Sequence, residues 1–474
     1  MPASRLTRRD APRPETGIVH FGLGAFFRAF GCVYIADAMA ASGGDWGITG
    51  VSLRSAGTRD ALRNQGWAYT AVSLGPDGAT PRVIEVLDDV LVAPENPFAV
   101  LDVMAKPTVK IVTLTVTEKG YCHHPATGAL NVDHPDILHD LASPTPKSAI
   151  GYVVRGLQMR HAAGGDPFTV LTCDNLPNNG KLVRGLVLEL AALIDPILAE
   201  WITTHGKFPG TMVDRITPAT MPADIAQVEQ MTGQLDAAPV MHEPFAQWVI
   251  EDDFVGGNRP DFAAVGVDMV RDVAPFEDMK LRMLNGTHSA LAYAGYLAGH
   301  KTISDTVADP VFAAFARGLW DEIMPTVQAP DGVDLPAYAD GLFDRYANPN
   351  IRHRTWQIAM DGSQKLPQRI FGTVQDSATS TPLLSLAIAC WMRYVGGKDE
   401  TGELIDVQDP LAQQFQILYS AAKTPEQAVA ALLGLREIFS NEMAVLLFEP
   451  VTLAAHQIWT HATRGAIARG VGSG

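Results

Sequence analysis

The chain lacks the features that mark several protein classes. It has only four cysteines in 474 residues, and none of them forms a C-x-x-C pair. Neither a zinc site nor a disulfide framework is therefore indicated, and reduced thiols fit a reducing compartment. No uncharged apolar run is long enough to span a bilayer, and residues 1–14 contain arginines but no apolar core of a secretory signal. We therefore expect a cytoplasmic protein without a membrane partner.

Positive charge is also scarce. The sequence contains 36 Lys and Arg against 52 Asp and Glu, a formal net charge of −16. This balance argues against non-specific nucleic-acid binding, which requires a basic surface. A small anionic substrate is still compatible, because a local basic pocket can lie inside an acidic protein. The 47% of hydrophobic residues and the length predict a globular protein of more than one domain.

A glycine turn follows the first apolar run. The segment 18–21 is strand-like, residues 22–28 read Gly-Leu-Gly-Ala-Phe-Phe-Arg, and residues 33–39 have helical character. Strand, glycine turn and helix open many dinucleotide-binding folds, because the turn lets the backbone approach a pyrophosphate. The third glycine of G-x-G-x-x-G is replaced by Phe27, so a plain strand-to-helix turn is an equal alternative.

The second expected strand, residues 46–53, bears on the choice of cofactor. Many NAD-binding folds place an acidic residue directly after this strand to hold the ribose hydroxyls. This chain has Arg54 and Ser55 there, with Arg59 close by. Since arginines could instead accept a 2′-phosphate, the residues physically permit both NAD and NADP.

Two strongly apolar segments end in polar clusters. Residues 109–116 are mostly β-branched and lead into residues 117–121, and residues 168–173 lead into Asp-Asn-Leu-Pro-Asn-Asn-Gly at 174–180. The carboxyl ends of parallel strands are where such folds bind ligands. The asparagines either form turns or donate amide hydrogen bonds to an oxyanion.

The strand signals mostly stop near residue 270. Another strand is predicted at 83–87 and one long helix at 181–201, whereas the segments after residue 280 are helical. We therefore predict two domains, residues 1–270 and 271–474, with a polar, basic linker at 347–368.

A helix predicted to begin at Pro275 gathers the candidate catalytic side chains. At about 100° per residue, Glu277, Lys280, Asn285 and His288 fall within roughly 140° of one another. Two leucines, at 281 and 284, share that side, so we expect it to be buried. A buried lysine loses its charge more readily than one in water and can act as a general base. A solvated polar face with a core histidine is an equal alternative.

Three motifs together resemble the mannitol dehydrogenase family of polyol-specific long-chain dehydrogenases. They are Lys280-x-x-x-x-Asn285-x-x-His288, Gly22-x-Gly-x-Phe26-x-Arg28 and Cys173-Asp-Asn175, and the resemblance covers about residues 17–460. Within the family, the sequences of residues 115–121, 174–180, 280–286 and 356–367 are most similar to the fructuronate reductase (D-mannonate oxidoreductase) branch.

This resemblance implies an α/β protein with a Rossmann-type N-terminal domain and a mainly α-helical C-terminal domain, and no metal. It implies that Lys280 is the acid–base group, that Asn175 and Asn285 hold the reacting oxygen, and that His288 binds a substrate hydroxyl. Glu277 would pass protons between the lysine and solvent. The expected cofactor-binding residues are Gly22, Gly24, Phe26, Arg28, Arg54 and Thr117, and the expected substrate-binding residues are Arg352, His353 and Lys365.

The chain departs from the family pattern in its cofactor segment. The family usually has histidines at the positions of Phe27 and Phe30, and an acidic residue at that of Ser55. Because Phe27 and Phe30 have no imidazole, any role that these histidines play in the family is in doubt for this chain. The second departure, at Ser55, weakens strict NAD preference, although the branch favours NAD, which we expect as the cofactor.

Three functions fit these residues. The first is reduction of a sugar acid, fructuronate to mannonate, and the second is a neutral-polyol dehydrogenase acting on mannitol, arabinitol or sorbitol. A cation in the pocket would separate them, and the candidates are Arg352, His353, Arg354, Lys365 and Arg369, unless these lie at the surface. The third is a non-catalytic dinucleotide sensor, against which the intact Lys280, Asn285 and His288 speak. We expect a monomer or a weak homo-oligomer.

Overall fold

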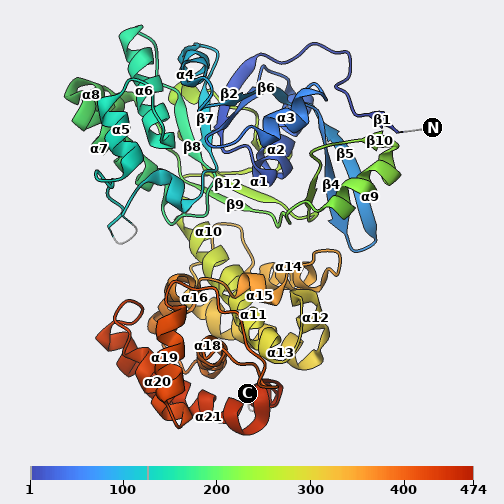
Figure 1. Ribbon diagram of the computed structural model, residues 1–474, viewed down its shortest axis with the longest axis vertical. Coiled ribbons are helices and arrows are strands. Elements are labelled where there is room, and N and C mark those ends of the chain that lie inside the picture. Colours follow the sequence, from blue (N-terminus) through green and yellow to red (C-terminus); the bar gives the residue numbers. More distant parts are fainter. Residues whose placement is uncertain (1–2, 125–126, 473–474) are drawn as a thin grey trace. The chain divides into compact units, whose positions relative to one another are not determined.

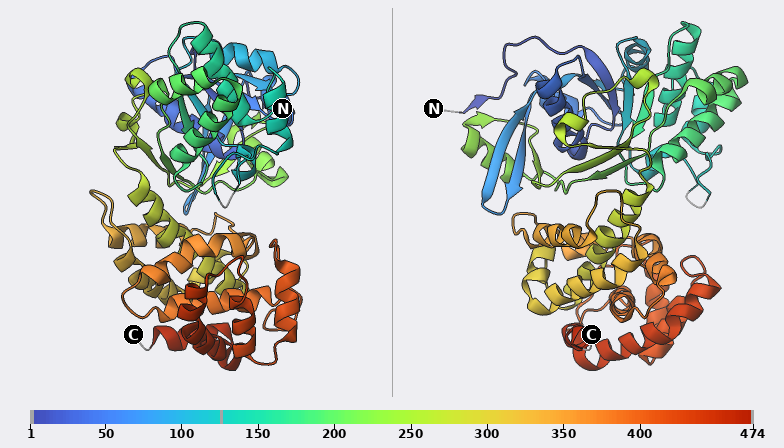
Figure 2. Two further views of the ribbon diagram at one scale, coloured as in Figure 1. Left: turned by 90° about the vertical axis from the view of Figure 1, so that its left-hand side faces the viewer. Right: turned by 180° about the vertical axis from the view of Figure 1, so that it is seen from behind.

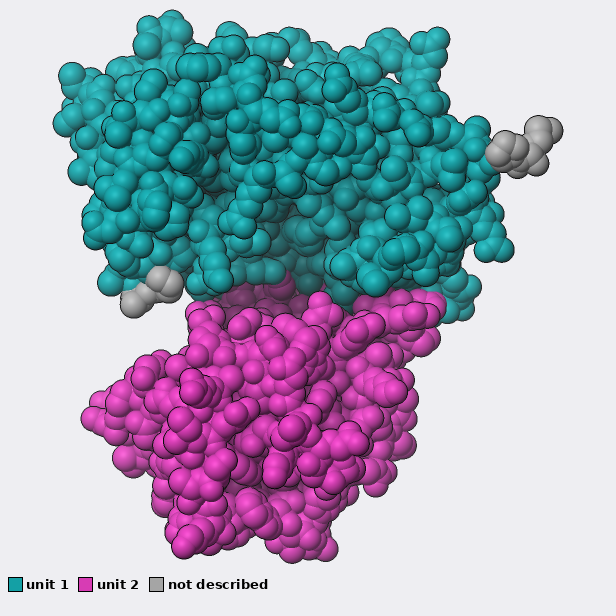
Figure 3. Space-filling model, in the orientation of Figure 1, with its two compact units in different colours: residues 1–274 teal, residues 275–474 magenta. Residues whose placement is uncertain are grey.

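The computed structural model describes residues 3–124 and 127–472. It divides into two compact units, Met1–Ala274 and Pro275–Gly474, which Figure 3 colours separately. The change of periodicity predicted near residue 270 falls just before this division. The first unit contains the strands and the second is helical, which confirms the predicted fold class (Figure 1).

A five-stranded parallel sheet forms the centre of the first unit. Its order is β6 (Leu87–Val92), β3 (Gly47–Ser52), β2 (Thr16–Phe21), β7 (Ile111–Leu114) and β8 (Thr169–Thr172). The chain builds outward from β2 in both directions, first to β3 and later to β7. This reversal of direction is the point at which open α/β sheets bind ligands, outside the carboxyl ends of the strands.

The two faces of this sheet belong to different cores, because successive side chains of a strand point to opposite faces. Val19 and Phe21 of β2 pack with α4 (Pro97–Ala105), α6 (Ala149–Ala162), α7 (Asn179–Ile194) and α8 (Pro196–His205). Ile18 packs on the other side, with α1 (Ala25–Ala29) and α2 (Gly31–Ser42). Figure 2 shows the sheet between these layers. Burial on both faces explains why the strands read as continuous apolar runs.

Three smaller sheets complete the first unit, in the orders β11-β4-β5, β13-β12-β9 and β1-β10. Their strands are β1 (Ser4–Arg5), β4 (Tyr69–Gly75), β5 (Gly78–Ile84), β9 (Thr211–Asp214), β10 (Gln234–Leu235), β11 (Val240–His242), β12 (Gln247–Glu251) and β13 (Asp268–Val270). The remaining helices are α3 (Gly57–Arg63), η1 (Glu118–Tyr121), α5 (Pro135–Ala142), α9 (Pro222–Thr232), η2 (Val255–Gly257) and η3 (Ala263–Val265).

Two predicted elements of this unit are wrong. The strand predicted at 83–87 spans the end of β5 and the start of β6, which belong to different sheets, and residues 85 and 86 lie outside both strands. The single helix predicted at 181–201 is two helices, α7 and α8. They separate at Asp195, whose carboxylate accepts a hydrogen bond from the Ile197 N–H at 2.9 Å and caps α8. Pro196 then occupies the first turn, where its missing N–H costs nothing.

Helices make up the second unit. They are α10 (Ala274–Met279), η4 (Lys280–Gly286), α11 (Thr287–Leu297), α12 (Ile303–Ala308), α13 (Pro310–Ile323), η5 (Met324–Thr326), α14 (Leu335–Ala347), α15 (Thr355–Ile358), α16 (Gly362–Leu366), η6 (Pro367–Phe371), α17 (Gly372–Asp376), α18 (Pro382–Val395), α19 (Ala412–Ala421), α20 (Pro425–Leu433) and α21 (Asn441–Val471). Two of them, η4 and η6, are π-helical.

The predicted linker at 347–368 is wrong, because α15, α16 and the start of η6 lie within it. Contacts from elsewhere in the unit hold these short helices. The Thr355 N–H donates to the Lys301 carbonyl at 3.1 Å. The Ser363 N–H and hydroxyl donate to the Asp409 carboxylate at 2.8 and 2.7 Å. Such distant partners leave no local pattern, so the segment reads as irregular from sequence alone.

One stretch among the described residues, Ala25–Ser42, is apolar and long enough to cross a membrane by length and composition. It comprises α1 and α2, which are broken at Phe30. Its large apolar side chains pack into the core beside the central sheet. Packing in the first unit therefore accounts for the apolar character of this stretch.

Candidate active site

The glycine turn after β2 leaves its backbone accessible. Gly22 has φ +89°, and a Cβ there would lie 2.0 Å from the Thr115 carbonyl oxygen, so only glycine fits. A Cβ at Gly24, the N-cap of α1, would meet only the Gly22 oxygen, at 3.7 Å. The space beside Gly24 is therefore open. This open backbone is what the pyrophosphate of a dinucleotide requires, so the turn fits the expected cofactor.

Arg28 and Phe26 point into contacts within the first unit. Arg28 is buried, its guanidinium lies 5.3 Å from the centroid of the Tyr69 ring, and it donates to the Ala238 carbonyl. Burial lowers the pKa of this guanidinium. Phe26 is half-buried and stacks on Phe30 at 5.1 Å. Their expected cofactor contacts stay predictions, and each side chain already has a packing role.

The two phenylalanines that replace family histidines are core residues. Phe27 stacks on His20 with the ring centroids 3.4 Å apart. The His20 ring nitrogens also lie 2.8 and 3.0 Å from the hydroxyls of Thr113 and Thr115, and burial lowers the pKa of His20 to about 3. Phe30 is fully buried against Trp248. Both departures therefore place apolar rings where apolar packing is needed.

Asp174 ties the carboxyl ends of β7 and β8 together. Its carboxylate accepts hydrogen bonds from the Val116 N–H at 2.8 Å, the Thr117 N–H at 3.2 Å and the Tyr121 hydroxyl at 2.8 Å. Thr117 and Asn175 both lie exposed beside this anchor. The anchor thus places the expected cofactor residue Thr117 and the expected amide donor Asn175 at the carboxyl ends of the strands, where folds of this kind bind ligands.

The arginines after β3 differ in their contacts. Arg59 forms ion pairs with Asp60 at 2.8 Å and with Glu95. Arg54 is exposed, and no partner for its guanidinium lies within residues 3–124 or 127–472. Of the two, Arg54 is the one whose guanidinium is not already neutralised by a carboxylate.

Lys280 and Asn285 lie on a π-helical turn of the second unit. Lys280 is buried, with 6% of its surface exposed, and Asn285 is half-buried. A π-helix bonds residue i to residue i+5, so it stacks two residues five apart more closely than an α-helix does. The predicted gathering of side chains assumed the α-helical angle, and the π-turn draws this pair closer together. Glu277 lies half-buried in the preceding α10.

Side chains from other helices hold this turn open. The Trp320 Nε1–H donates to the Met283 carbonyl at 3.0 Å, and the Tyr346 hydroxyl donates to the Leu284 carbonyl at 2.8 Å. Arg282 pairs with Asp278 and Asp376, each at 2.7 Å. π-bulges are rare and occur often at functional sites. Specific contacts from the rest of the second unit therefore stabilise the π-helical turn.

His288 is the buried centre of the candidate site. Its ring lies 4.7 Å from that of His353 and is stacked at 5.4 Å on Tyr346. Its Nε2 is buried and finds no hydrogen-bond partner among the described residues. Burial is the main cause that lowers the pKa of His288, and the nearby His353, Arg369, Arg345 and Lys365 lower it further. A neutral imidazole with an unmet nitrogen suits the predicted binding of a substrate hydroxyl.

The expected substrate-binding cations divide into two groups. Arg352 and Arg354 are exposed. His353 is half-buried, and burial and Arg345 lower its pKa to about 4. Lys365 and Arg369 are half-buried and lie near His288, and burial lowers the pKa of each. The structure thus brings Lys365, His353 and Arg369 toward His288, whereas Arg352 lies at the surface.

Sequence reasoning missed two contributors to this cluster. Ser289 is buried and accepts a hydrogen bond from Arg369 Nη1 at 3.1 Å. Tyr346 stacks on His288 and bonds to η4. Neither residue carries a distinctive pattern, although the position of Ser289 directly after the signature histidine was a usable signal.

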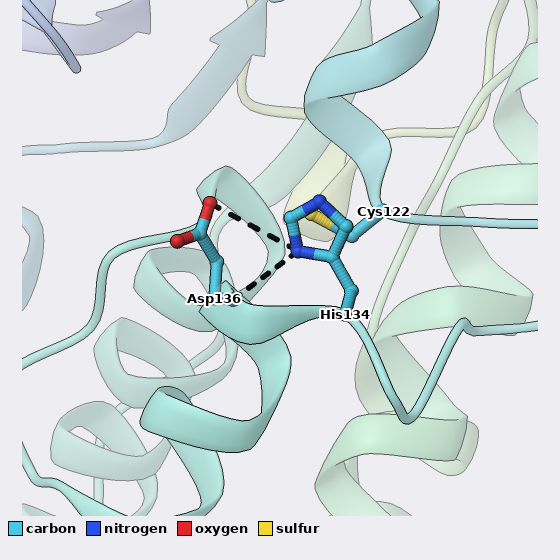
Figure 4. A group of neighbouring side chains, drawn as sticks. All are labelled: Cys122, His134 and Asp136. Atoms are coloured by element: carbon cyan, nitrogen blue, oxygen red, sulfur yellow. Dashed lines mark hydrogen bonds and ion pairs between the residues drawn. The ribbon is translucent and has the colours of Figure 1, made fainter.

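One group of potential metal ligands occurs within residues 3–124 and 127–472. The ligand atoms of Cys122, His134 and Asp136 lie within 4.8 Å of one another (Figure 4). The His134 Nδ1 accepts the Asp136 N–H at 3.2 Å and so caps α5. Burial raises the pKa of the Cys122 thiol to about 12, which opposes the thiolate that a metal needs. Helix capping and packing explain this group.

Comparison with known proteins identifies relatives over nearly the whole chain. The mannitol dehydrogenase Rossmann domain matches residues 16–263, and the mannitol dehydrogenase C-terminal domain matches residues 272–459. The uncharacterized oxidoreductase YeiQ of Escherichia coli K12 is 48% identical, over 92% of this chain and 90% of that protein. The D-mannonate oxidoreductase of the same strain is 46% identical, over 92% and 91%.

A solved structure is similar in sequence and fold. It is the mannitol 2-dehydrogenase of Pseudomonas fluorescens in a ternary complex with NAD and D-mannitol. It is 36% identical to this chain with a TM-score of 0.84, and the match covers 100% of this chain and 97% of that one.

Proposed function

The chain belongs to the mannitol dehydrogenase family of oxidoreductases, and we propose that it transfers a hydride between NAD(H) and a sugar acid, reducing fructuronate to mannonate. Two relatives bear on the substrate. The D-mannonate oxidoreductase is more similar in sequence, at 46% identity, than the mannitol 2-dehydrogenase of known structure, at 36%. The sequence comparison therefore favours the sugar acid over the neutral polyol.

The charge around His288 carries this proposal. Besides burial, every group that shifts the pKa of His288 is a cation or a second imidazole, and each shifts it downward. A neutral polyol needs only hydrogen bonds, whereas half-buried cations such as Lys365 and Arg369 are costly to desolvate, a cost that Asp361 and Asp409 offset in part at Lys365. A substrate carboxylate would lower that cost and be held by charge-assisted hydrogen bonds.

The residues of the second unit supply the proton chemistry. Reduction of a ketone requires a hydride at carbon and a proton at oxygen, and NADH, when bound, supplies the hydride. Lys280 would donate the proton, and in the reverse direction accept it. The Asn285 amide would donate a hydrogen bond to the reacting oxygen. By analogy with single oxyanion donors, this bond would raise the rate roughly 10²–10³-fold. We retain Asn175 as a second amide donor and Glu277 as the proton path on the family resemblance.

NAD is the cofactor that the observations favour. The space beside Gly24 leaves the turn after β2 open for a pyrophosphate, and Gly22 permits the turn itself through its positive φ. Among the arginines after β3, Arg59 is engaged by two carboxylates and is a poor 2′-phosphate ligand. The related structure contains NAD.

The test compares a sugar acid with its neutral counterpart. The purified full chain is assayed by nicotinamide absorbance with fructuronate, tagaturonate and fructose. We expect a clear preference for fructuronate in kcat/KM. Equal efficiency with fructose, or a preference for it, would reject the sugar-acid proposal in favour of mannitol 2-dehydrogenase or another neutral-polyol dehydrogenase. No turnover with any substrate would favour the non-catalytic sensor.

A further inference from the structure

We propose that Arg369 forms the carboxylate-binding subsite of the second unit and so sets the preference for a sugar acid over a neutral sugar. This inference rests on the proposed function and assigns one residue to it. Arg369 lies in the π-helical η6, whose backbone touches the π-helical η4. A Cβ at Gly286 of η4 would lie 2.7 Å from the Arg369 carbonyl oxygen, which shows how closely the two turns approach.

The guanidinium of Arg369 is hydrogen-bonded to α11, the helix that carries His288. Its Nη1 donates to the Ser289 hydroxyl at 3.1 Å, and Ser289 follows His288 directly in α11. His288 responds to this charge, since Arg369 is among the cations that lower its pKa. One bond to a buried serine therefore holds the guanidinium beside α11, the helix that carries His288.

The other donors of Arg369 are available. No acceptor for its Nε–H or Nη2–H lies within residues 3–124 or 127–472, and neither atom belongs to the buried polar atoms without a partner. Each of these atoms therefore keeps some solvent exposure and has no hydrogen-bond acceptor among the described residues. An arginine with two such donors can bind a carboxylate in a bidentate way, which a lysine cannot do.

The neighbouring candidates fit this task less well. Lys365 Nζ donates to the Met360 carbonyl at 2.7 Å and is a single-point donor. The pKa of His353 is lowered to about 4, so its ring carries no charge near neutral pH. Arg352 is exposed, where a charge contributes little to binding.

The experiment measures substrate preference in variants of the full chain. The Arg369→Gln variant should lose roughly 10- to 100-fold in kcat/KM for fructuronate, mainly through KM, because a charge-assisted bond is removed. Its kcat/KM for fructose should change by no more than about twofold. The Arg369→Lys variant, which keeps the charge but loses bidentate geometry, should fall between wild type and Arg369→Gln.

Two further variants separate binding from folding. Arg436→Gln removes an exposed arginine of the same unit and should leave both efficiencies unchanged. Ser289→Ala leaves the guanidinium in place but releases Nη1, and should lower the efficiency for fructuronate alone, even if Arg369→Gln fails to fold.

The outcomes distinguish this inference from the proposed function. If wild type prefers fructuronate and Arg369→Gln keeps that preference, the subsite is wrong and the carboxylate binds elsewhere in the cluster. If Arg369→Gln lowers both substrates equally, the role of Arg369 is structural. If wild type prefers fructose, the proposed function itself fails.

Discussion

The contact between the two π-helical turns gives a sharp prediction for Gly286→Ala. Gly286 has φ −62° and ψ −55°, which any residue can adopt, so only space is at issue. An added Cβ would lie 2.7 Å from the Arg369 carbonyl oxygen, and backbone must move to accept it. Overpacking of this kind costs about 1–3 kcal/mol, against a gain of up to about 1 kcal/mol from replacing glycine in a helix.

Gly341→Ala is the matched control. Gly341 lies in α14 of the same unit, is exposed, and has no atom within 4 Å of its would-be Cβ. This variant should be stabilised by up to about 1 kcal/mol. Each kcal/mol moves the Tm of a domain of this size by roughly 2–4 °C. The transition that Gly341→Ala raises in calorimetry identifies the second unit.

The difference in stability between the two variants tests whether the contact between η4 and η6 is tight. We expect Gly286→Ala to be less stable than Gly341→Ala by about 1–3 kcal/mol. It should also lose efficiency with fructuronate, because the displaced η6 carries Arg369. Equal stability of the two variants would show that η4 and η6 can separate freely, and would refute the argument that their contact positions the site.

Three other predictions concern the reaction and its conditions. Lys280→Ala should lower turnover by roughly 10²–10⁴-fold with little change in Tm, and a variant that keeps a tenth of wild-type turnover would disprove the acid–base role. Steady-state kinetics should give a higher kcat/KM with NAD than with NADP, and a tenfold preference for NADP would point to Arg54. Stability should fall between pH 6.5 and about 3 by up to about 1.4 kcal/mol per pH unit from His20, because burial lowers its pKa to about 3 and the unfolded chain binds the proton first. His20→Asn should flatten the dependence of Tm on pH, and an unchanged slope would contradict this.

The parts of the fold that the sequence predicts are those with strong local signals. The parallel strands β2, β7 and β8 are continuous apolar runs because both of their faces are buried. The polar residues that follow β7 and β8 are directly visible in the sequence. Two misses also had usable signals. The hairpin of β4 and β5 turns at Pro76-Asp-Gly78, and α8 begins at an Asp-Pro pair, both of which are turn or cap sequences.

Other features depend on partners far along the chain. Short helices such as α16 persist because Asp409 accepts hydrogen bonds from Ser363. The roles of Phe27 and Phe30 depend on rings that they meet only in the folded unit, His20 and Trp248. No local sequence pattern reveals these contacts. The sequence therefore shows that phenylalanine replaces histidine at these two positions, but not which rings the phenylalanines pack against.

The candidate site shows the same division between spacing and geometry. Asn285 lies five positions after Lys280, and this spacing is visible in the sequence. On a regular α-helix the two would diverge, whereas the π-turn stacks residues five apart. Trp320 and Tyr346, from two other helices, donate hydrogen bonds to the Met283 and Leu284 carbonyls within that turn. The same Tyr346 stacks on His288, so the residue that holds the turn open also positions the imidazole. The motif therefore specifies which groups are present, and the surrounding helical unit specifies their arrangement.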